Sequence, residues 1–292
     1  MNDLVTGIGE VLWDMLPDGR KIGGAPANFA YHISQFGLPG CVVSAVGRDS
    51  LGDEISTIVD AKGIINRIER TDYPTGTVKV EVDADGIPQY DICSNVAWDH
   101  IPFTEQLEAT ARRTRAVCFG SLAQRSEESR RTINRFLDAM PREAESLVVF
   151  DVNLRQNFFD REILTESIGR CDILKINDEE LAVVSRMFDC SGGDDIEICR
   201  EIISRFGLRI LILTCGINGS HVVTGEDVSF LPTPRVDVAD TVGAGDSFTA
   251  AFTASLLKGK SIAQAHRTAV DTSAFVCSHY GAMPELPAAI TG

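Results

Sequence analysis

Residues 173–188 read ILKINDEELAVVSRMF, and this stretch contains both kinds of element from which we expect the fold to be built. Ile173 to Ile176 is a short run dominated by branched apolar residues, which predicts a strand in a sheet covered on both faces. Asp178 to Phe188 follows at once with a helical pattern. A strand that leads directly into a helix is typical of parallel α/β sheets.

The same alternation continues along the chain in both directions. Further strands are predicted at 42–46, 117–120, 147–151 and 209–214, and further helices at 26–36, 51–62, 104–113, 126–140 and 196–206. No Pro/Gly/Ser-rich linker, repeat or low-complexity tract divides the sequence. We therefore expect a single domain over residues 1–292, of α/β class with a mostly parallel sheet.

The composition is that of an ordinary globular protein, with 44% hydrophobic and 24% charged residues in 292. A net charge of −15 and the lack of Lys/Arg runs argue against a nucleic-acid partner. The eight cysteines form no CxxC pair, which argues against a zinc ribbon and favours free thiols. The N-terminus does not resemble a signal peptide and no apolar run is long enough to span a membrane, so we expect a cytoplasmic protein without a membrane partner.

One region departs from this rhythm. Residues 77–82 (TVKVEV) alternate strictly, Asp85-Gly86 offers a turn, and residues 87–92 could return as a second strand. The apolar stripe of Val78, Val80 and Val82 needs a cover, which the domain body, a ligand or another subunit could supply. We favour a lid or an interface over a plain hairpin at the edge of the main sheet.

The segment 240–248, DTVGAGDSF, leads into a helical pattern that we expect from about Ser247 to Leu257. Two glycines and an alanine before a helix start allow consecutive backbone N–H groups to converge on one point, where the helix dipole also favours negative charge. Such a turn can hold a phosphoryl group, with Asp246 beside it in the first helical turn. The alternative is a helix cap whose glycines serve only a tight turn.

The motif D-T-x-G-A-G-D resembles the C-terminal signature of the ribokinase-like (PfkB-type) carbohydrate kinases, and it is complete in residues 240–246. The N-terminal signature of that family, a Gly-Gly pair followed by Asn, is matched by residues 23–28, whose GGAPAN spelling is similar to that of bacterial fructokinases. The resemblance implies a three-layer α/β/α fold with a mostly parallel central sheet. It also implies a small β-sheet lid, formed by about residues 11–20 and 75–92.

For catalysis, the resemblance implies that Asp246 accepts the proton of the attacking sugar hydroxyl. The backbone N–H groups of Gly243, Ala244, Gly245 and Asp246 would hold the transferred phosphoryl. Because a carboxylate at a helix N-terminus is stabilised in its charged form, we expect Asp246 to be a weak base. This is tolerable in phosphoryl transfer, which needs the nucleophile positioned more than deprotonated early.

For the sugar, the resemblance implies contacts from Asp14, Gly24 and Asn28. Gly24 would let the backbone approach the sugar, and the amide of Asn28 offers both a donor and an acceptor to its hydroxyls. Within the D-x-N-x-R stretch of residues 151–155, Arg155 would meet phosphate or substrate. The alternatives are a solvated strand-end acid at Asp14 and a helix-face amide at Asn28.

For ATP, the resemblance implies a nucleotide site that includes Asn177, Thr214, Gly216 and Gly219, with Glu180 holding Mg²⁺ through water. Asn177 and Glu180 belong to an N-x-x-E motif, which taken alone is a common helix capping box.

A monovalent cation, K⁺ in particular, binds beside the anion site in many members of the family. The corresponding positions here are Asp240, Val242, Val276, His279 and Gly281. Glu285 stands where a small hydroxyl residue is familiar, which puts dependence on the cation in doubt.

These features together predict ATP-dependent phosphorylation of a primary hydroxyl of a neutral sugar, with fructose converted to fructose 6-phosphate. The alternatives are another sugar kinase of the family, acting on ribose, 2-keto-3-deoxygluconate or a nucleoside, and a catalytically silent regulator that binds sugar or nucleotide. We also expect a homodimer through the lid.

Overall fold

The structure is a computed structural model that describes residues 3–16, 19–82 and 88–292, and the strands among them form two sheets. The larger sheet has nine strands. In spatial order they are β13 (Val228–Leu231), β12 (Ser220–Val223), β11 (Ile210–Thr214), β10 (Ile173–Asn177), β9 (Leu147–Asp151), β8 (Thr114–Gly120), β1 (Leu4–Ile8), β4 (Gly40–Gly47) and β5 (Ile65–Thr71). All neighbours from β11 to β5 pair in parallel, whereas β12 and β13 are antiparallel additions. The expected α/β architecture with a mostly parallel sheet is confirmed.

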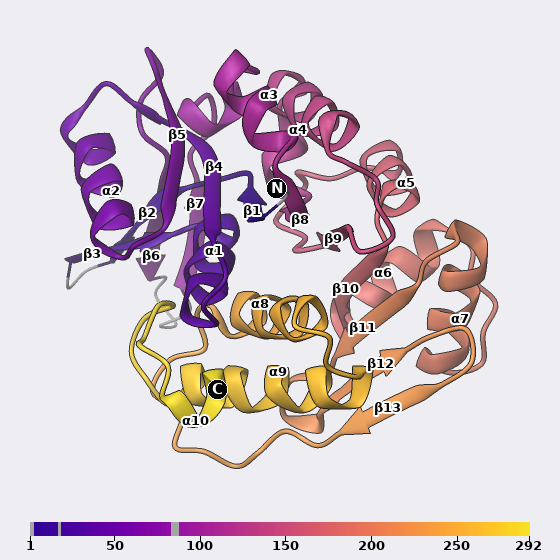
Figure 1. Cartoon of the computed structure of the whole chain (residues 1–292). Helices are drawn as coiled ribbons and strands as arrows, with labels where there is room; N and C mark the ends of the chain where they lie inside the picture. The colour runs from indigo at the N-terminus through magenta and orange to yellow at the C-terminus, as the bar shows by residue number, and fades with distance from the viewer. Residues whose placement is uncertain (1–2, 17–18, 83–87) are drawn as a thin grey trace.

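Helices cover both faces of this sheet (Figure 1). They are α1 (Ala25–Gln35), α2 (Ser50–Ala61), α3 (Glu105–Ala111), α4 (Glu127–Ala139), α5 (Arg161–Arg170), α6 (Asp178–Met187), α7 (Asp195–Phe206), α8 (Ala244–Leu257), α9 (Ile262–Cys277) and α10 (Ala288–Thr291). Alternate residues of one strand pack against different helices. In β8, Val117 and Phe119 join the core formed with α3 to α7, whereas Ala116 and Cys118 join the core formed with α1, α8 and α9. This two-sided burial explains why the strands are nearly continuous in apolar residues.

Some elements differ from the sequence-based expectation. Strands β1, β5, β12 and β13 are not among the elements predicted from the sequence. Strand β1 ends at Ile8, before Gly9 with its φ of 148°, and the next strand begins at Leu12 in a different sheet. Helix α8 begins at Ala244, three residues before the expected Ser247, because Gly243 caps it in a left-handed conformation with a φ of 77°.

The smaller sheet has four strands in the order β3-β2-β6-β7, namely β3 (Gly19–Gly23), β2 (Leu12–Leu16), β6 (Thr77–Val82) and β7 (Pro88–Ile92). It contains parts of both segments expected to form a lid and continues to Gly23. Strands β6 and β7 pair antiparallel as expected, but β6 also pairs in parallel with β2. The hairpin therefore belongs to a separate sheet and is not an edge of the main one.

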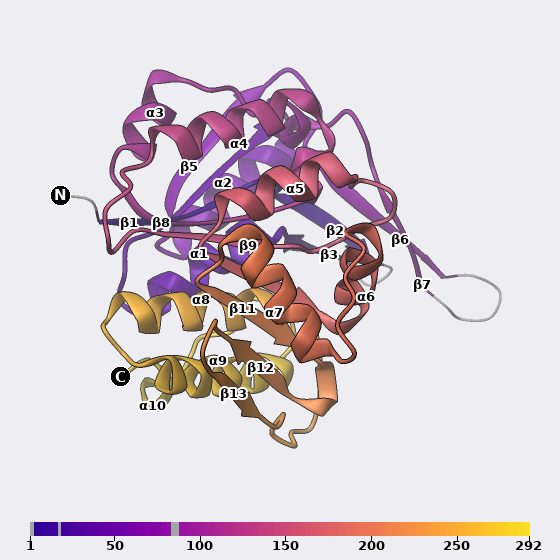
Figure 2. The same ribbon diagram turned by 90° about the vertical axis from the view of Figure 1, so that its right-hand side faces the viewer.

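The small sheet stands at the side of the domain, with β6 and β7 reaching beyond its body (Figure 2). The side chain of Val78 is 5% exposed and packs into the core on the α3 to α7 side, so the domain body covers this end of the valine stripe. The expected turn at Asp85-Gly86 and the side chains of Val80 and Val82 lie outside the described residues.

The strand order places a topological switch point between β8 and β1. From β1 the chain adds β4 and β5 on one side, and from β8 it adds β9, β10 and β11 on the other. In open α/β sheets, ligands bind outside the carboxyl ends of the strands at such a point. The candidate site is therefore expected beyond Ile8, Gly120 and Asp151.

The eight cysteines are all free thiols, as the sequence predicted. Among the described residues, no helix combines the length and the apolar character needed to cross a membrane.

Candidate active site

The N-termini of α1 and α8 meet at the switch point. Asn28 lies in the first turn of α1 and Asp246 in the first turn of α8, and Asn28 Nδ2 donates to Asp246 Oδ2 at 2.7 Å. The two residues are separated by 218 positions in the sequence, so the fold brings the two signatures into direct contact. The positive ends of two helix dipoles then point at one region, which favours a negatively charged ligand there.

Two glycines at the start of α1 allow close approach of neighbouring groups. At Gly24, which has a φ of 115°, a Cβ atom would lie 2.4 Å from the carbonyl oxygen of Glu10. At Gly23, a Cβ atom would lie 2.5 Å from Asp14 Oδ2. Any larger side chain would push the β1–β2 connection and the Asp14 carboxylate away from α1, which explains the Gly-Gly pair in physical terms.

The turn before α8 has a geometry suited to an anion. A Cβ atom on Gly243 would lie 2.5 Å from Ala282 Cβ, so only glycine fits there. Ala244 N donates to Thr241 O at 3.3 Å, whereas the N–H groups of Gly245 and Asp246 lie in the first turn, where a helix supplies no acceptor. A Cβ atom on Gly245 would lie 3.0 Å from Lys175 Nζ, so an ammonium group faces the same turn.

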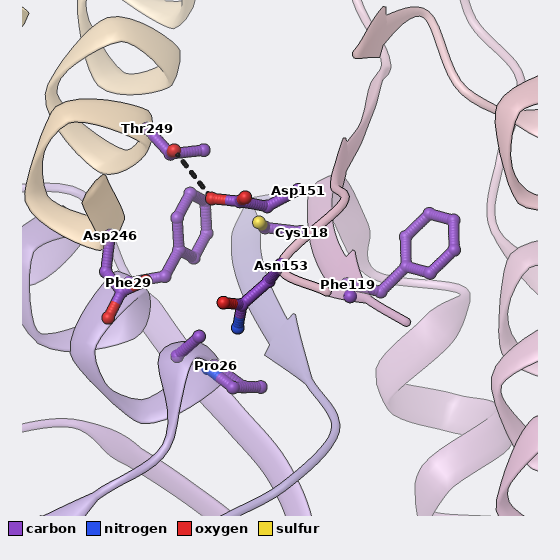
Figure 3. A pocket seen from close by; sticks show the side chains of 10 residues that line it. Pro26, Phe29, Cys118, Phe119, Asp151, Asn153, Asp246 and Thr249 are labelled. Atoms are coloured by element: carbon purple, nitrogen blue, oxygen red, sulfur yellow. Dashed lines mark hydrogen bonds between the residues drawn. The ribbon is translucent and has the colours of Figure 1, made fainter. Parts of the chain in front are cut away.

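Asp151 and Lys175 form a buried ion pair beside this turn. They are register partners, Asp151 at the end of β9 and Lys175 in the middle of β10, and Lys175 Nζ lies 3.1 Å from Asp151 Oδ1. Thr249 Oγ1 of α8 donates to the other carboxylate oxygen at 3.2 Å (Figure 3). Burial opposes the charge of Lys175, but the carboxylates of Asp151 and Glu180 outweigh it and raise the pKa of Lys175. Lys175 therefore stays cationic.

Asp151 and Asn153 belong to the D-x-N-x-R stretch, but no role was expected for them, nor for Lys175 and Glu10. The available signal was a charged residue within or at the end of an apolar strand, as in ILKI and VVFD. Such a charge is expected to be paired or functional, because burying it alone is costly. Asn153 has a φ of 43° and lines the same pocket as Asp246 (Figure 3).

The expectation that Asp246 is a weak base is wrong. Burial raises the pKa of Asp246, and the nearby carboxylate of Asp151 raises it further. The hydrogen bond from Asn28 and the positive charge of Lys175 oppose this shift without cancelling it. The helix dipole alone was a poor guide, because only the tertiary structure shows how deeply the carboxyl is buried and what faces it.

Asn177 and Glu180 form a reciprocal capping box at the start of α6. Asn177 Oδ1 accepts from Glu180 N at 2.8 Å, and Glu180 Oε2 accepts from Asn177 N at 3.0 Å. Glu180 Oε1 also accepts from Leu154 N at 2.9 Å, which ties α6 to the loop after β9. Burial raises the pKa of Glu180, and Lys175 opposes this shift. The capping role is therefore real, and it places this carboxylate beside the Asp151–Lys175 pair.

The turn after β11 lies next to α6, because Thr214 is the register partner of Asn177. Cys215 N donates to Gly219 O at 2.8 Å and closes a tight loop in which Gly216 has a φ of 53° and Gly219 a φ of 111°. Ile217 at the tip of this loop is 91% exposed. Thr214, Gly216 and Gly219 therefore lie at the end of β11, beside the Asn177 cap of α6.

Asp14 and Arg155 are the two remaining residues that the resemblance implies for the substrate site. Asp14 is in β2 of the small sheet, partly buried, and burial raises its pKa although Lys21 opposes this. Arg155 follows β9 and is exposed, with Nη1 donating to Leu154 O at 3.0 Å. Its positive charge acts on both Asp246 and Glu10, so it faces the candidate site.

The positions expected to bind a monovalent cation also come together. Asp240 Oδ1 accepts from Val242 N at 3.0 Å, and Asp240 Oδ2 accepts from Gly281 N at 3.1 Å. The carbonyl oxygen of Val276 accepts from His279 N at 3.0 Å. Lys21 Nζ lies 3.9 Å from Asp240 Oδ2, so a cationic side chain already stands near this loop.

Comparison with known proteins agrees with this geometry. Residues 18–289 match the family described as pfkB family carbohydrate kinase. The chain is 28% identical to an ATP-dependent 6-phosphofructokinase of Thermoanaerobacterium thermosaccharolyticum, over 98% of this chain and 91% of that protein. It is 30% identical to a fructokinase of Klebsiella pneumoniae, over 88% of this chain and 85% of that protein.

A solved fructokinase of Xylella fastidiosa with bound ATP superposes with a TM-score of 0.85 at 20% identity, over 98% of this chain and 96% of that one. That likeness concerns the fold. The match over residues 18–289, with both signatures meeting at Asp246, identifies the chain as a member of the pfkB family of carbohydrate kinases.

Proposed function

We propose that this sugar kinase transfers the γ-phosphoryl group of ATP to the 6-hydroxyl of fructose. The observation that supports a kinase site most directly is the contact between Asn28 and Asp246 at 2.7 Å, beside two helix N-termini and the Lys175 ammonium. An acceptor for a hydroxyl proton and donors for a phosphoryl group then lie side by side. Fructose is supported by the GGAPAN spelling and by the similarity to the Klebsiella pneumoniae fructokinase.

In this mechanism the sugar hydroxyl lies against Asp246 and attacks the γ-phosphorus in line with the leaving ADP oxygen. The new P–O bond forms as the bond to ADP breaks, and the hydroxyl proton passes to Asp246. The raised pKa of Asp246 makes it a better proton acceptor than an ordinary aspartate. The amide of Asn28 keeps its carboxylate in place.

The transferred phosphoryl group would be stabilised by the N–H groups of Gly245 and Asp246 and by Lys175. Ala244 contributes less than expected, because its N–H is drawn toward Thr241 O. These donors are fixed before substrate arrives, so little reorganisation accompanies the reaction.

The residues present fit a Mg²⁺ ion that arrives with ATP. Among the described residues no group of three or more His, Cys, Asp or Glu side chains could hold a metal unaided. Each carboxylate oxygen of Glu180 accepts one backbone N–H, which leaves further lone pairs for water ligands of the ion. Glu180 would hold Mg²⁺ in this way, and the ion would supply charge neutralisation at the phosphates.

A second candidate substrate is fructose 6-phosphate, because the similar protein of Thermoanaerobacterium thermosaccharolyticum is an ATP-dependent 6-phosphofructokinase. The exposed guanidinium of Arg155 is the group that would suit a sugar phosphate.

ADP release measured over a panel of acceptors tests the proposed function. The panel contains fructose, fructose 6-phosphate, ribose, 2-keto-3-deoxygluconate and a nucleoside. We expect the highest kcat/KM with fructose. A higher kcat/KM with another acceptor would show that this acceptor, and not fructose, is the preferred substrate. No turnover with any acceptor, together with ATP binding, would favour a silent regulator.

We further propose that the loop around Asp240 and Gly281 binds K⁺. The proximity of the Val276 and Asp240 backbone to the anion turn supports this, whereas Lys21 near the Asp240 carboxylate weighs against it. Activity measured in sodium or tetramethylammonium salts in place of potassium tests the proposal, and equal activity in all three would overturn it.

A further inference from the structure

Glu10 is a buried acid that no step described above uses. It follows the end of β1 at the switch point and is 3% exposed. Among the residues that the structure describes, its Oε2 atom accepts no hydrogen bond. Asn28 Oδ1 is likewise buried and accepts no hydrogen bond in this part of the chain, although Nδ2 of the same amide donates to Asp246. Two buried acceptors without donors therefore flank the proposed base.

Groups from three parts of the chain face Glu10. The carboxylate of Asp246 in α8 repels the ionised form of Glu10, and the guanidinium of Arg155, which follows β9, attracts it. The carboxyl of Glu10 also faces two backbone N–H donors, that of Ala25 at the start of α1 and that of Glu10 itself. The carbonyl oxygen of Glu10 packs against Gly24, where a Cβ atom would approach to 2.4 Å. Glu10 is thus held against the Gly-Gly pair from which the sugar contacts are expected.

A hydroxyl-bearing ligand supplies what is missing here. Each sugar hydroxyl can donate one hydrogen bond and accept others, so it can satisfy a carboxyl or an amide oxygen that lacks a donor. A phosphate oxygen cannot donate in its ionised form and would be repelled by a carboxylate. The chemistry therefore favours the acceptor sugar over the triphosphate as the partner of this group.

We propose, on the basis of the sugar-kinase function above, that Glu10 is a sugar-binding residue whose carboxyl contacts a second hydroxyl of the acceptor sugar. Asn28 Oδ1 takes a further hydroxyl in the same way. The sugar then lies between Glu10, Asn28 and Asp14, with its reacting hydroxyl against Asp246.

The protonation state of Glu10 adds a dependence on pH. Burial raises the pKa of Glu10 to about 7, with Asp246 adding to the shift and Arg155 and the two amides opposing it. Below this pH the carboxyl is neutral and can both donate to and accept from a hydroxyl. Above it, a second negative charge stands beside Asp246 and the incoming phosphates. Sugar binding should therefore weaken as the pH rises through about 7.

The experiment compares Glu10→Gln and Glu10→Leu with the wild type by steady-state kinetics, using the best acceptor of the panel. Glutamine is neutral at every pH and keeps a donor and an acceptor, whereas leucine removes both. Asp72→Asn serves as the control, because the Asp72 side chain is 94% exposed and pairs only with Arg48 in the described structure. Thermal melting and ATP binding by calorimetry confirm that each variant is folded.

We expect Glu10→Leu to raise the sugar KM by at least about tenfold, in the range of a lost hydrogen bond to a polar substrate group, with the ATP KM unchanged. We expect Glu10→Gln to keep the wild-type sugar KM within about threefold at pH 6.5. Between pH 7 and 9 the wild-type kcat/KM for sugar should fall, by up to about tenfold per pH unit once Glu10 is ionised. The Glu10→Gln variant should lack this decline.

Three results would overturn the proposal. The first is an unchanged sugar KM in the Glu10→Leu variant. The second is a rise of the ATP KM alone in that same variant. The third is a Glu10→Gln variant that keeps the wild-type alkaline decline, which remains informative if the leucine variant does not fold. If the wild type phosphorylates a sugar and any of these results is found, only the role of Glu10 is refuted and the proposed function stands. No turnover with any acceptor would refute the proposed function and this inference together.

Discussion

At the scale of single residues, Asp246 decides whether the site is catalytic. We expect Asp246→Asn to fold and bind ATP but to lose at least about a hundredfold in kcat, the usual contribution of a positioned general base. ATP binding by calorimetry and kcat by ADP release measure the two effects. A kcat within a few-fold of the wild type would reduce Asp246 to a helix cap.

The direction of its pKa shift adds a dependence on pH at the acid side. Asp246 accepts a proton only when it is ionised, and its pKa is raised. Activity is therefore present above this raised pKa and is lost as the pH falls through it, which begins above the ordinary aspartate value of about 3.9. A kcat profile from pH 4 to 8 should show this acid limb. An activity that persists down to pH 4 would contradict the assignment of Asp246 as the base.

Asp14 is a second single residue at the sugar site, where we expect it to bind the sugar and not to take the proton. Its partly buried carboxylate lies against Gly23 on the small sheet, where it can accept from sugar hydroxyls. Loss of hydrogen bonds to a charged group costs about 1.5–3 kcal/mol, so Asp14→Ala should raise the sugar KM by about tenfold or more. The ATP KM serves as the internal control. A change confined to the ATP KM would place Asp14 on the nucleotide side.

At the scale of elements, the side chain of Glu180 in helix α6 has two roles: it caps the start of the helix and it is proposed to hold Mg²⁺ through water. Glu180 accepts backbone N–H groups from Asn177 and Leu154, and glutamine can replace only one of its two acceptor oxygens. We expect Glu180→Gln to lower the free energy of unfolding by about 1–3 kcal/mol, the cost of an unsatisfied buried group. If Glu180 also holds Mg²⁺ through water, the variant should require more Mg²⁺ for half-maximal activity.

Glu197→Gln is the matched control. Glu197 occupies the corresponding position in the first turn of α7, where Asp194 caps the helix and Glu197 accepts from Gly193 N at 2.7 Å. It lies in a different helix from the proposed metal site, so its variant should leave the Mg²⁺ titration unchanged. An unchanged titration in Glu180→Gln as well would leave this carboxylate with the capping role alone.

At the scale of the whole molecule, we predict that the small sheet acts as a lid and that two copies of the chain pair through it. Strands β6 and β7 of this sheet reach beyond the body of the domain (Figure 2). The domain body already covers Val78, so we expect a partner to contact other parts of this sheet. Sedimentation at micromolar concentration tests the pairing, and a wild-type monomer would contradict it.

The sequence by itself determined the fold class and the family. Fully buried strands require continuous apolar runs, and helices that lead directly from them require capping residues such as Asn177, so both are visible in local patterns. The anion turn at residues 243–246 and the Gly-Gly pair are also local, because each depends on backbone geometry that few residues allow.

Only the tertiary structure decided which side chains share the site and how strongly they are charged. The Asp151–Lys175 pair depends on the register between β9 and β10, and the buried state of Glu10 depends on α1 packing over the end of β1. The raised pKa of Asp246 reverses the expectation from its helix position, because burial and a neighbouring carboxylate outweigh the dipole. Burial and electrostatic interactions depend on residues far apart in the chain, so no local pattern of residues contains them.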